Sequence, residues 1–149
     1  MIIRDLTLEQ DDMLRFMKFM KAFDQESAEV HVDVEYAAKR YGDMVRQGIA
    51  HIIVAEDSSG NYLGSLGFVV AYGLHENVFF AVETFWYVAP EHRGIGRELL
   101  FAFEGKALEL GCQKTAMIHL VDSYPESLKV FYERNGYHLT ESHYVKDLA

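Results

Sequence analysis

The chain has 149 residues, of which 50% are hydrophobic and 13% aromatic. This composition excludes a disordered chain and suits one domain with a sizeable core. The formal net charge of −9 argues against nucleic acid as the main partner, because phosphate binding requires a clustered basic surface. An acidic surface serves solubility, and it would also attract a cationic amine.

Membrane insertion, secretion and metal binding are also disfavoured. No apolar run approaches the roughly 18 residues of a membrane span, and the acidic start MIIRDLTLEQDD differs from the basic start of a signal or transit peptide. The single cysteine, Cys112, excludes an internal disulfide and a thiolate zinc cluster, and we expect it at the edge of the core. The histidines lack metal-ligand spacing. We therefore expect a soluble, cytoplasmic protein that needs no metal and no membrane.

The first third of the chain predicts a short strand and two helices. Residues 2–3 open the strand, and residues 7–10 have the spacing of a capping box that starts a helix. Methionines and phenylalanines continue this helix toward Phe23 at the spacing of a core face. A second amphipathic helix is predicted over 34–47, with Gly48 as its stop.

An antiparallel meander of three strands is predicted next. Its strands are residues 50–57, 62–74 and 78–90, joined by the turns SSGN and HEN. The third strand runs into a glycine turn and a helix over 96–110 that Gly111 ends, and residues 112–121 return as a strand. We expect the two strands that flank this helix to be parallel neighbours.

The end of the chain predicts one more helix and one more strand. Residues 123–126 form a second capping box with Pro125 in the first helical turn, where its missing N–H is tolerated. A short helix over 127–135 is closed by Gly136, and residues 137–148 predict a final strand or hairpin. We expect a single α+β domain over residues 1–149.

Two motifs stand out on this framework. Residues 85–100, FWYVAPEHRGIGRELL, join a strand to a helix through a glycine turn, and residues 130–137 read VFYERNGY. With the element order, they resemble the GNAT superfamily, which moves acyl groups from acyl-coenzyme A to amines. The resemblance implies a central, mostly antiparallel sheet with one splayed parallel strand pair and about four flanking helices. The closing residues 141–148 also resemble the end of small members found in bacteriophages.

The glycine turn has two interpretations. It is a plain turn, since glycine supplies backbone angles that other residues resist, or it holds the pyrophosphate of acetyl-CoA as the resemblance implies. A helix start offers unpaired N–H groups and a positive dipole end, to which arginines add charge-assisted bonds. The residues implied are Arg93, Gly94, Ile95, Gly96 and Arg97.

This turn departs from the family pattern. If the glycines are aligned, Glu91 stands where the family has glutamine or arginine; if Arg93 is aligned, Glu98 falls on a small-residue position. An asparagine that often precedes the family tyrosine by seven residues is replaced here by Pro125. The turn is thus about two residues shorter than usual.

The pantetheine arm of coenzyme A is an extended amide chain, which can pair with a strand as a peptide does. By resemblance it would lie between two splayed strands, residues 85–88 and 115–120. The backbone of Trp86 and Val88 would then meet it.

A carboxylate on the third meander strand is the candidate base, since acyl transfer requires a deprotonated amine. Strict alternation would place Glu83, Phe85 and Tyr87 on one face and Thr84 and Trp86 on the other. Burial would raise the pKa of Glu83, which suits a base acting directly or through water. The alternative is a glutamate on a solvated face. By resemblance, the family base often occupies this strand position.

The candidate acid is Tyr132, which matches the family tyrosine that protonates the departing thiolate. A phenol can donate to a thiolate while staying protonated at neutral pH, and the alternative is an aromatic that only packs its helix. His119 is another candidate acid or base, with a core histidine as its alternative.

We expect an N-acetyltransferase that transfers an acetyl group from acetyl-CoA to a primary amine by direct attack in a ternary complex. The acceptor is a small molecule or a protein, and by resemblance the two N-terminal helices and the loop of residues 23–34 form its side of the site. The acidic residues there point to a cationic amine. An acyl-CoA-binding module without transfer and a structural or anti-host interaction protein stay open, as does a homodimer.

Overall fold

The computed structural model describes residues 1–27, 30–120 and 125–149, which form two units, Met1–Ile118 and His119–Ala149. The predicted fold class is confirmed, because the described residues form a five-stranded, mostly antiparallel sheet with one parallel pair and four α-helices. The prediction of one domain over the whole chain stays a prediction.

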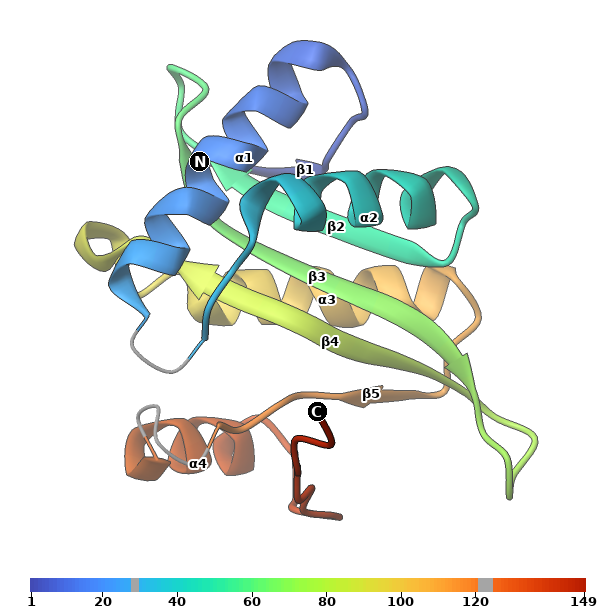
Figure 1. Cartoon of the computed structure of the whole chain (residues 1–149). Helices are drawn as coiled ribbons and strands as arrows, with labels where there is room; N and C mark the ends of the chain where they lie inside the picture. The colour runs from blue at the N-terminus through green and yellow to red at the C-terminus, as the bar shows by residue number, and fades with distance from the viewer. Residues whose placement is uncertain (28–29, 121–124) are drawn as a thin grey trace. The chain divides into compact units, whose positions relative to one another are not determined.

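The sheet of the first unit follows the order of its strands along the chain, β1-β2-β3-β4-β5 (Figure 1). Neighbouring strands are antiparallel except β4 and β5, which form the predicted parallel pair. The strands are β1 (Ile2–Asp5), β2 (Ala50–Glu56), β3 (Tyr62–Tyr72), β4 (Phe79–Val88) and β5 (Lys114–Ala116).

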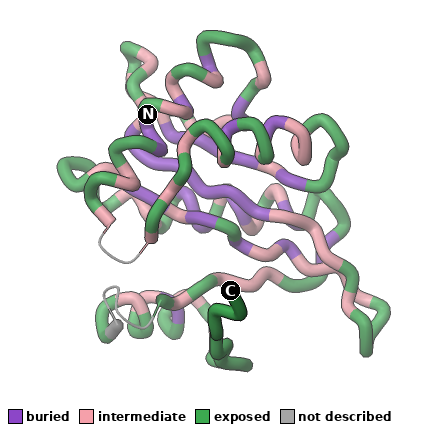
Figure 2. Tube along the Cα trace, in the orientation of Figure 1, coloured by how far each residue is buried: buried purple, intermediate pink, exposed green. Residues whose placement is uncertain are grey.

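Helices cover both faces of this sheet (Figure 1). On one face, Phe16 of α1 packs against Phe85 of β4 with ring centroids 6.0 Å apart. On the other, Phe103 of α3 packs against Phe68 of β3 at 4.9 Å. The middle strands between these layers are the most buried part of the unit (Figure 2). The helices are α1 (Gln10–Glu26), α2 (Val34–Arg46) and α3 (Gly96–Glu109), with a 3-10 helix, η1 (Pro90–His92), before α3.

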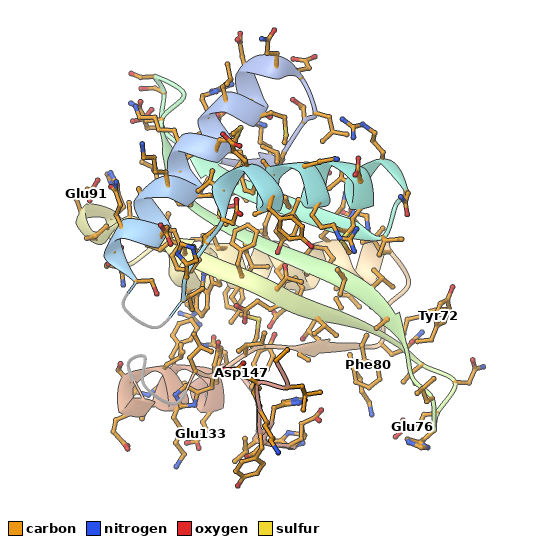
Figure 3. All side chains as sticks on the ribbon, viewed as in Figure 1. Tyr72, Glu76, Phe80, Glu91, Glu133 and Asp147 are labelled. Atoms are coloured by element: carbon orange, nitrogen blue, oxygen red, sulfur yellow. The ribbon has the colours of Figure 1, made fainter. Side chains whose placement is uncertain are left out.

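The predicted turns and helix stops agree with the structure. Gly60 in the β2–β3 turn has φ +79°, and Gly48 and Gly111, which follow α2 and α3, have φ +73° and +84°. Glycine tolerates these left-handed angles without strain. The β3–β4 hairpin, where Figure 3 labels Tyr72 and Glu76, ends in an aromatic pair, Tyr72 and Phe79, with ring centroids 4.9 Å apart.

The prediction that the 7–10 capping box starts the first helix is wrong. Helix α1 begins at Gln10, and its N-cap residue, Glu9, makes no side-chain cap bond. The backbone N–H and hydroxyl of Thr7 donate instead to the carboxylate of Asp12, at 2.7 and 2.9 Å. Asp12, a buried acid in the first turn of α1, is thus the hydrogen-bond partner of Thr7, in place of the Gln10 partner that the capping box predicts.

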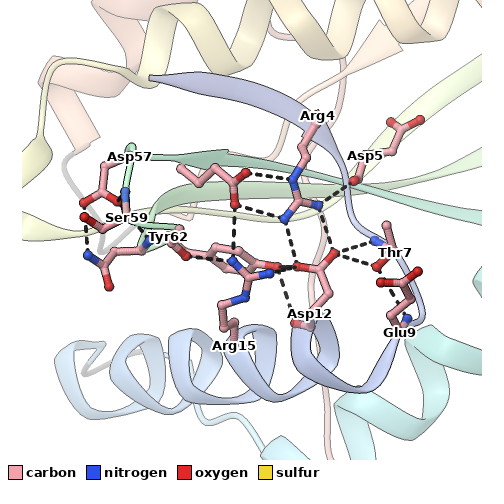
Figure 4. A network of polar contacts seen from close by, with 12 residues as sticks. Arg4, Asp5, Thr7, Glu9, Asp12, Arg15, Asp57, Ser59 and Tyr62 are labelled. Carbon is pink, nitrogen blue, oxygen red and sulfur yellow. Dashed lines mark hydrogen bonds and ion pairs between the residues drawn. The ribbon is translucent and has the colours of Figure 1, made fainter.

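Asp12 is the centre of a polar network that joins α1 to the sheet (Figure 4). It is only 3% exposed, and its carboxylate accepts two bonds of 2.9 Å from Arg4 of β1 and one from the Tyr62 hydroxyl of β3. Arg4 also bonds Glu56 of β2 at 3.0 Å. Burial opposes the charge of Asp12, but the bonds from Arg4, Tyr62 and Thr7 hold its pKa well below the usual range.

The predicted strand over 112–121 is shorter than expected, because only Lys114–Ala116 pairs with β4, beside residues 80–82. Beyond this point the N–H of Ile118 donates to the Glu83 side chain rather than to a backbone carbonyl. The two strands therefore stop pairing at Glu83. Cys112, just before β5, is buried as expected.

The second unit holds the last helix, α4 (Pro125–Arg134), and the C-terminal segment. Gly136 follows α4 with φ +86° as the predicted stop, whereas the second predicted capping box includes Ser123, outside the described residues. The predicted strand or hairpin over 137–148 is wrong, since residues 137–149 form no helix or strand. Leu139, Tyr144, Val145 and Leu148 lie in solvent, with Tyr144 97% exposed, so alternation alone does not make a strand without a sheet edge to pair with.

Candidate active site

Strand β4 has a bulge at Thr84. Gly67 pairs with Phe85 and Phe68 with Glu83, which leaves Thr84 as an extra residue. The Tyr41 hydroxyl of α2 donates to Thr84 Oγ1 at 2.6 Å, and the Tyr41 ring packs edge-on against Phe85 at 5.5 Å. Thr84 and Phe85 therefore both reach α2. The predicted alternation, which put them on opposite faces, is wrong because the bulge interrupts it.

Glu83 lies just before this bulge and is buried, with 7% of its surface exposed. The alternative of a solvated glutamate is thus wrong. Its Oε2 accepts a 2.7 Å hydrogen bond from the Ile118 backbone N–H. Burial raises the pKa of Glu83 to about 7, although the bond from Ile118 lowers it in part. A carboxyl group of this pKa can take up and release a proton near neutral pH.

Among the described residues, the edge of β4 that faces away from β3 pairs with β5 only at residues 80–82. The Ala89 N–H donates to the Leu63 carbonyl at 2.9 Å, so the neighbouring pair, Val88 and Gly64, turn their N–H and C=O groups away from each other. Because this pattern alternates along an antiparallel ladder, Trp86 does the same. The backbone groups of Trp86 and Val88 are thus directed away from β3, which is the direction that pairing with an extended amide ligand requires.

Helix α3 starts directly after this strand and the η1 turn. Its first intrahelical bond runs from the Leu99 N–H to the Ile95 carbonyl, at 3.1 Å, and Ile95 makes no side-chain cap bond. The N–H groups of Gly96, Arg97 and Glu98 precede that bond and have no acceptor within the helix. They are donors that a phosphate can use, aligned with the positive end of the helix dipole.

The two glycines of the turn have different roles. Gly94 has φ +133°, and a Cβ built on it would meet no atom within 4 Å, so it supplies both the backbone angle and open space for a ligand. A Cβ on Gly96 would lie 3.0 Å from Cζ2 of Trp86, so Gly96 lets the start of α3 pack closely on the indole. The outward-directed backbone groups of β4 and the helix start without a side-chain cap together suit an extended ligand with a phosphate at one end.

The two arginines of the turn differ in their surroundings. Arg93 forms an ion pair with Glu26 of α1, and its guanidinium lies 5.9 Å from the ring centroid of Tyr87. Arg97 is exposed and lies 5.0 Å from the ring of Phe101, one turn further along α3. Contacts of either side chain with a phosphate stay predictions.

The second unit holds the other two candidates, Tyr132 and His119. Tyr132 is 8% exposed, and its ring packs edge-on against His119 with centroids 6.3 Å apart. The Nε2 atom of His119 is buried without a hydrogen-bond partner among the described residues. The structure thus brings the two proton-carrying candidates of this unit together, and the catalytic role of each stays a prediction.

Sequence reasoning missed three residues of the first unit that hold the candidate site. They are Ile118, which bonds Glu83; Tyr41, which contacts the bulge; and Glu26, which pairs with Arg93. Each contacts a residue at least 35 positions away along the chain, and no local pattern marks it.

The structure offers no candidate metal site, because the described residues contain no group of three His, Cys, Asp or Glu side chains able to hold an ion. Nor is any helix in the described ranges long and apolar enough to span a membrane.

Comparisons with known proteins agree on one domain type. A family model described as acetyltransferase (GNAT) domain matches residues 48–139, whereas a search of curated proteins gave no match. A probable acetyltransferase of known structure has 17% identity and a TM-score of 0.80 over 100% of this chain and 99% of its own. Ribosomal-protein-alanine N-acetyltransferase from Brucella melitensis biovar Abortus 2308 has 21% identity and a TM-score of 0.76, over 99% of this chain and 100% of its own. Glucosamine-6-phosphate N-acetyltransferase from Arabidopsis thaliana has 18% identity and a TM-score of 0.73 over 100% of both chains.

Proposed function

Because the chain belongs to the GNAT acetyltransferase family, we propose that it transfers an acetyl group from acetyl-CoA to a primary amine by direct attack in a ternary complex. The observation that supports this proposal most directly is the buried carboxylate of Glu83, at the point where β4 and β5 stop pairing. A proton acceptor with a pKa of about 7 thus lies where the two parallel strands separate, which is where we place the amine that must lose its proton.

Acetyl-CoA would be held by two groups of donors and acceptors in the first unit. The backbone groups of Trp86 and Val88 that point away from β3 suit the amide chain of pantetheine, and the N–H groups of Gly96, Arg97 and Glu98 with the Arg97 guanidinium suit the pyrophosphate. When bound, acetyl-CoA supplies the activated thioester. The protein contributes orientation and proton transfer, and holding both reactants together supplies much of the rate.

We assign the base to Glu83. Its Oε2 accepts the hydrogen bond from the Ile118 N–H, so we assign Oε1 as the oxygen that takes the proton of the amine. This bond holds the carboxylate in one orientation as it changes charge. Above a pH of about 7 the carboxyl group is ionised and able to act, directly or through one water.

We assign the acid to Tyr132, on its match to the family tyrosine. Its phenol is buried in the second unit beside His119, and a phenol can donate to a developing thiolate while it stays protonated at neutral pH. His119 is the second candidate for this step. Tyr132→Phe and His119→Ala distinguish the two, because only loss of the true donor lowers turnover without weakening the binding of acetyl-CoA.

The acceptor is a small molecule or a protein amine. The net charge of −9 supports a cationic amine, which the protein's field would attract. The two structural neighbours with named acceptors act on different compounds, an alanine of a ribosomal protein and glucosamine-6-phosphate, so fold likeness does not select an acceptor. We further propose a cytoplasmic location, and we keep the bacteriophage resemblance of residues 141–148 and a homodimer as predictions.

The test combines ligand binding with turnover. We expect acetyl-CoA to raise the melting temperature of the protein increasingly as its concentration exceeds the dissociation constant, and a panel of primary amines to release free coenzyme A thiol. Glu83→Gln should bind acetyl-CoA normally and release thiol far more slowly. No thermal shift at millimolar acetyl-CoA would refute the proposal, whereas binding without thiol release across the panel would favour an acyl-CoA-binding module.

A further inference from the structure

A cluster of three side chains connects the end of α1 to the glycine turn. Glu26 is the last residue of α1 and forms an ion pair with Arg93, the residue directly before Gly94. Figure 1 shows η1 beside the C-terminal end of α1, and Glu91 of η1 is labelled at this place in Figure 3. The 67 positions between Glu26 and Arg93 make this a tertiary contact that fixes one element against another.

Tyr87 is the third member of the cluster and is held in place by packing. It is 6% exposed, and its ring stacks on Phe23 of α1 with centroids 4.7 Å and planes 28° apart. Burial and a hydrogen bond to the Glu26 carboxylate raise the pKa of the Tyr87 hydroxyl. The Arg93 guanidinium lies over the same ring, at 5.9 Å, where the electron-rich face attracts a cation. The Glu26 carboxylate therefore serves two partners that both precede the turn.

We propose that Glu26 and Tyr87 make Arg93 a positioning residue for the glycine turn, so that Arg93 holds the turn in place and is not itself a phosphate ligand. The inference rests on the proposed function, in which this turn binds the pyrophosphate of acetyl-CoA. Gly94 has no side chain to anchor the turn, so the anchor must come from a neighbour. Arg93 provides it, and the phosphate meets backbone N–H groups and Arg97.

The two possible roles of Arg93 predict opposite effects when Glu26 is removed. If Arg93 were a phosphate ligand, Glu26 would compete for its guanidinium, and losing Glu26 would tighten the binding of acetyl-CoA. If Arg93 is an anchor, losing Glu26 releases the turn and weakens binding. The anchor also predicts non-additivity, because removal of either partner breaks the same contact.

The experiment is a double-mutant cycle on coenzyme A binding, measured by isothermal titration calorimetry. We expect Glu26→Ala and Arg93→Ala each to raise the dissociation constant about fivefold, and the double variant to raise it no further, as for a coupling of moderate size. Asp43→Ala, which breaks the exposed 3.1 Å ion pair with Arg46 on α2, is the matched control and should leave the constant unchanged. Tighter binding by Glu26→Ala, or additive losses in the double variant, would overturn the proposal.

A second measurement separates this inference from the proposed function. Hydrogen exchange of residues 89–98 in the free protein should be faster in Glu26→Ala and Arg93→Ala than in the wild type and in Asp43→Ala, because the anchor acts without ligand. Circular dichroism checks that each variant is folded. Unchanged exchange in both variants would refute the anchor. If the wild type does not bind coenzyme A but exchange responds as expected, the proposed function fails and the anchor stands.

Discussion

Glu83→Gln tests the central electrostatic feature of the candidate site through stability alone, without a substrate. In the folded protein, burial raises the pKa of Glu83 from its usual value of 4.5 to about 7. The difference between these two values corresponds to about 3 kcal/mol of free energy. The folded protein thus binds this proton more tightly than the unfolded chain does.

The sign follows from proton linkage. Between pH 4.5 and pH 7 the folded state holds the Glu83 proton and the unfolded chain has lost it, so the free energy of unfolding falls as the pH rises through this range. Above pH 7 the bound proton of Glu83 no longer contributes to the free energy of unfolding. Glutamine carries no charge at any pH and can still accept from Ile118, so the variant avoids this loss.

The assay is urea unfolding followed by circular dichroism at pH 5 and pH 8. We expect the free energy of unfolding of Glu83→Gln, relative to wild type, to rise by about 2–3 kcal/mol between the two pH values. Glu35→Gln, at an exposed position in the first turn of α2, should show no such change. The same difference between Glu83→Gln and wild type at both pH values would refute the reasoning, since Glu83 would then have its usual pKa.

Four further outcomes are expected. The acid limb of the wild-type pH–rate profile should have an apparent pKa near 7, and Glu83→Gln should remove that limb and lower turnover by roughly 10²–10⁴-fold; an unchanged limb would point to another base. Asp12→Asn should cost about 3 kcal/mol in urea unfolding at pH 7, since it breaks a buried ion pair, and it should reduce the wild type's loss of stability as the pH falls below 4 and Asp12 is protonated; a variant as stable as wild type would contradict this. Gly94→Ala should cost about 1–3 kcal/mol because φ is +133°, whereas Gly105→Ala, within α3 and with nothing within 4 Å of the added methyl group, should gain about 0.5–1 kcal/mol; equal effects would argue against strain at Gly94. Tyr132→Phe should lower turnover and leave the calorimetric affinity for acetyl-CoA unchanged, and undiminished turnover would remove Tyr132 from the mechanism.

The sequence predicted those features of the fold that depend on local backbone chemistry. Gly48 and Gly111 end helices with left-handed angles that few other residues adopt, and hydrophobic alternation over residues 50–90 was enough for the meander. The glycine turn was found for the same reason. Its position between a strand and a helix follows from the order of residues alone.

Features that depend on distant partners could not be predicted. Nothing near Glu83 in sequence indicates that Ile118 donates to it. The residues around Thr84 likewise do not predict the β-bulge that Tyr41 contacts. Residues 137–148 show the opposite case: their alternation is typical of a strand, but a strand also requires an edge to pair with. The family resemblance assigned Arg93 to the phosphate, but its ion pair with Glu26, 67 positions away, has no signal in the neighbouring sequence.

The close approach of Gly96 to Trp86 has a practical consequence. Trp86 is the only tryptophan of the chain, and its ring carbon Cζ2 lies beside the first residue of α3. The tryptophan fluorescence of the protein, excited selectively over its tyrosines, therefore comes from an indole at the helix end that we assign to the pyrophosphate. A ligand bound there changes the polarity around this one fluorophore, so its emission reports occupancy of the turn directly, without a label and without a reaction.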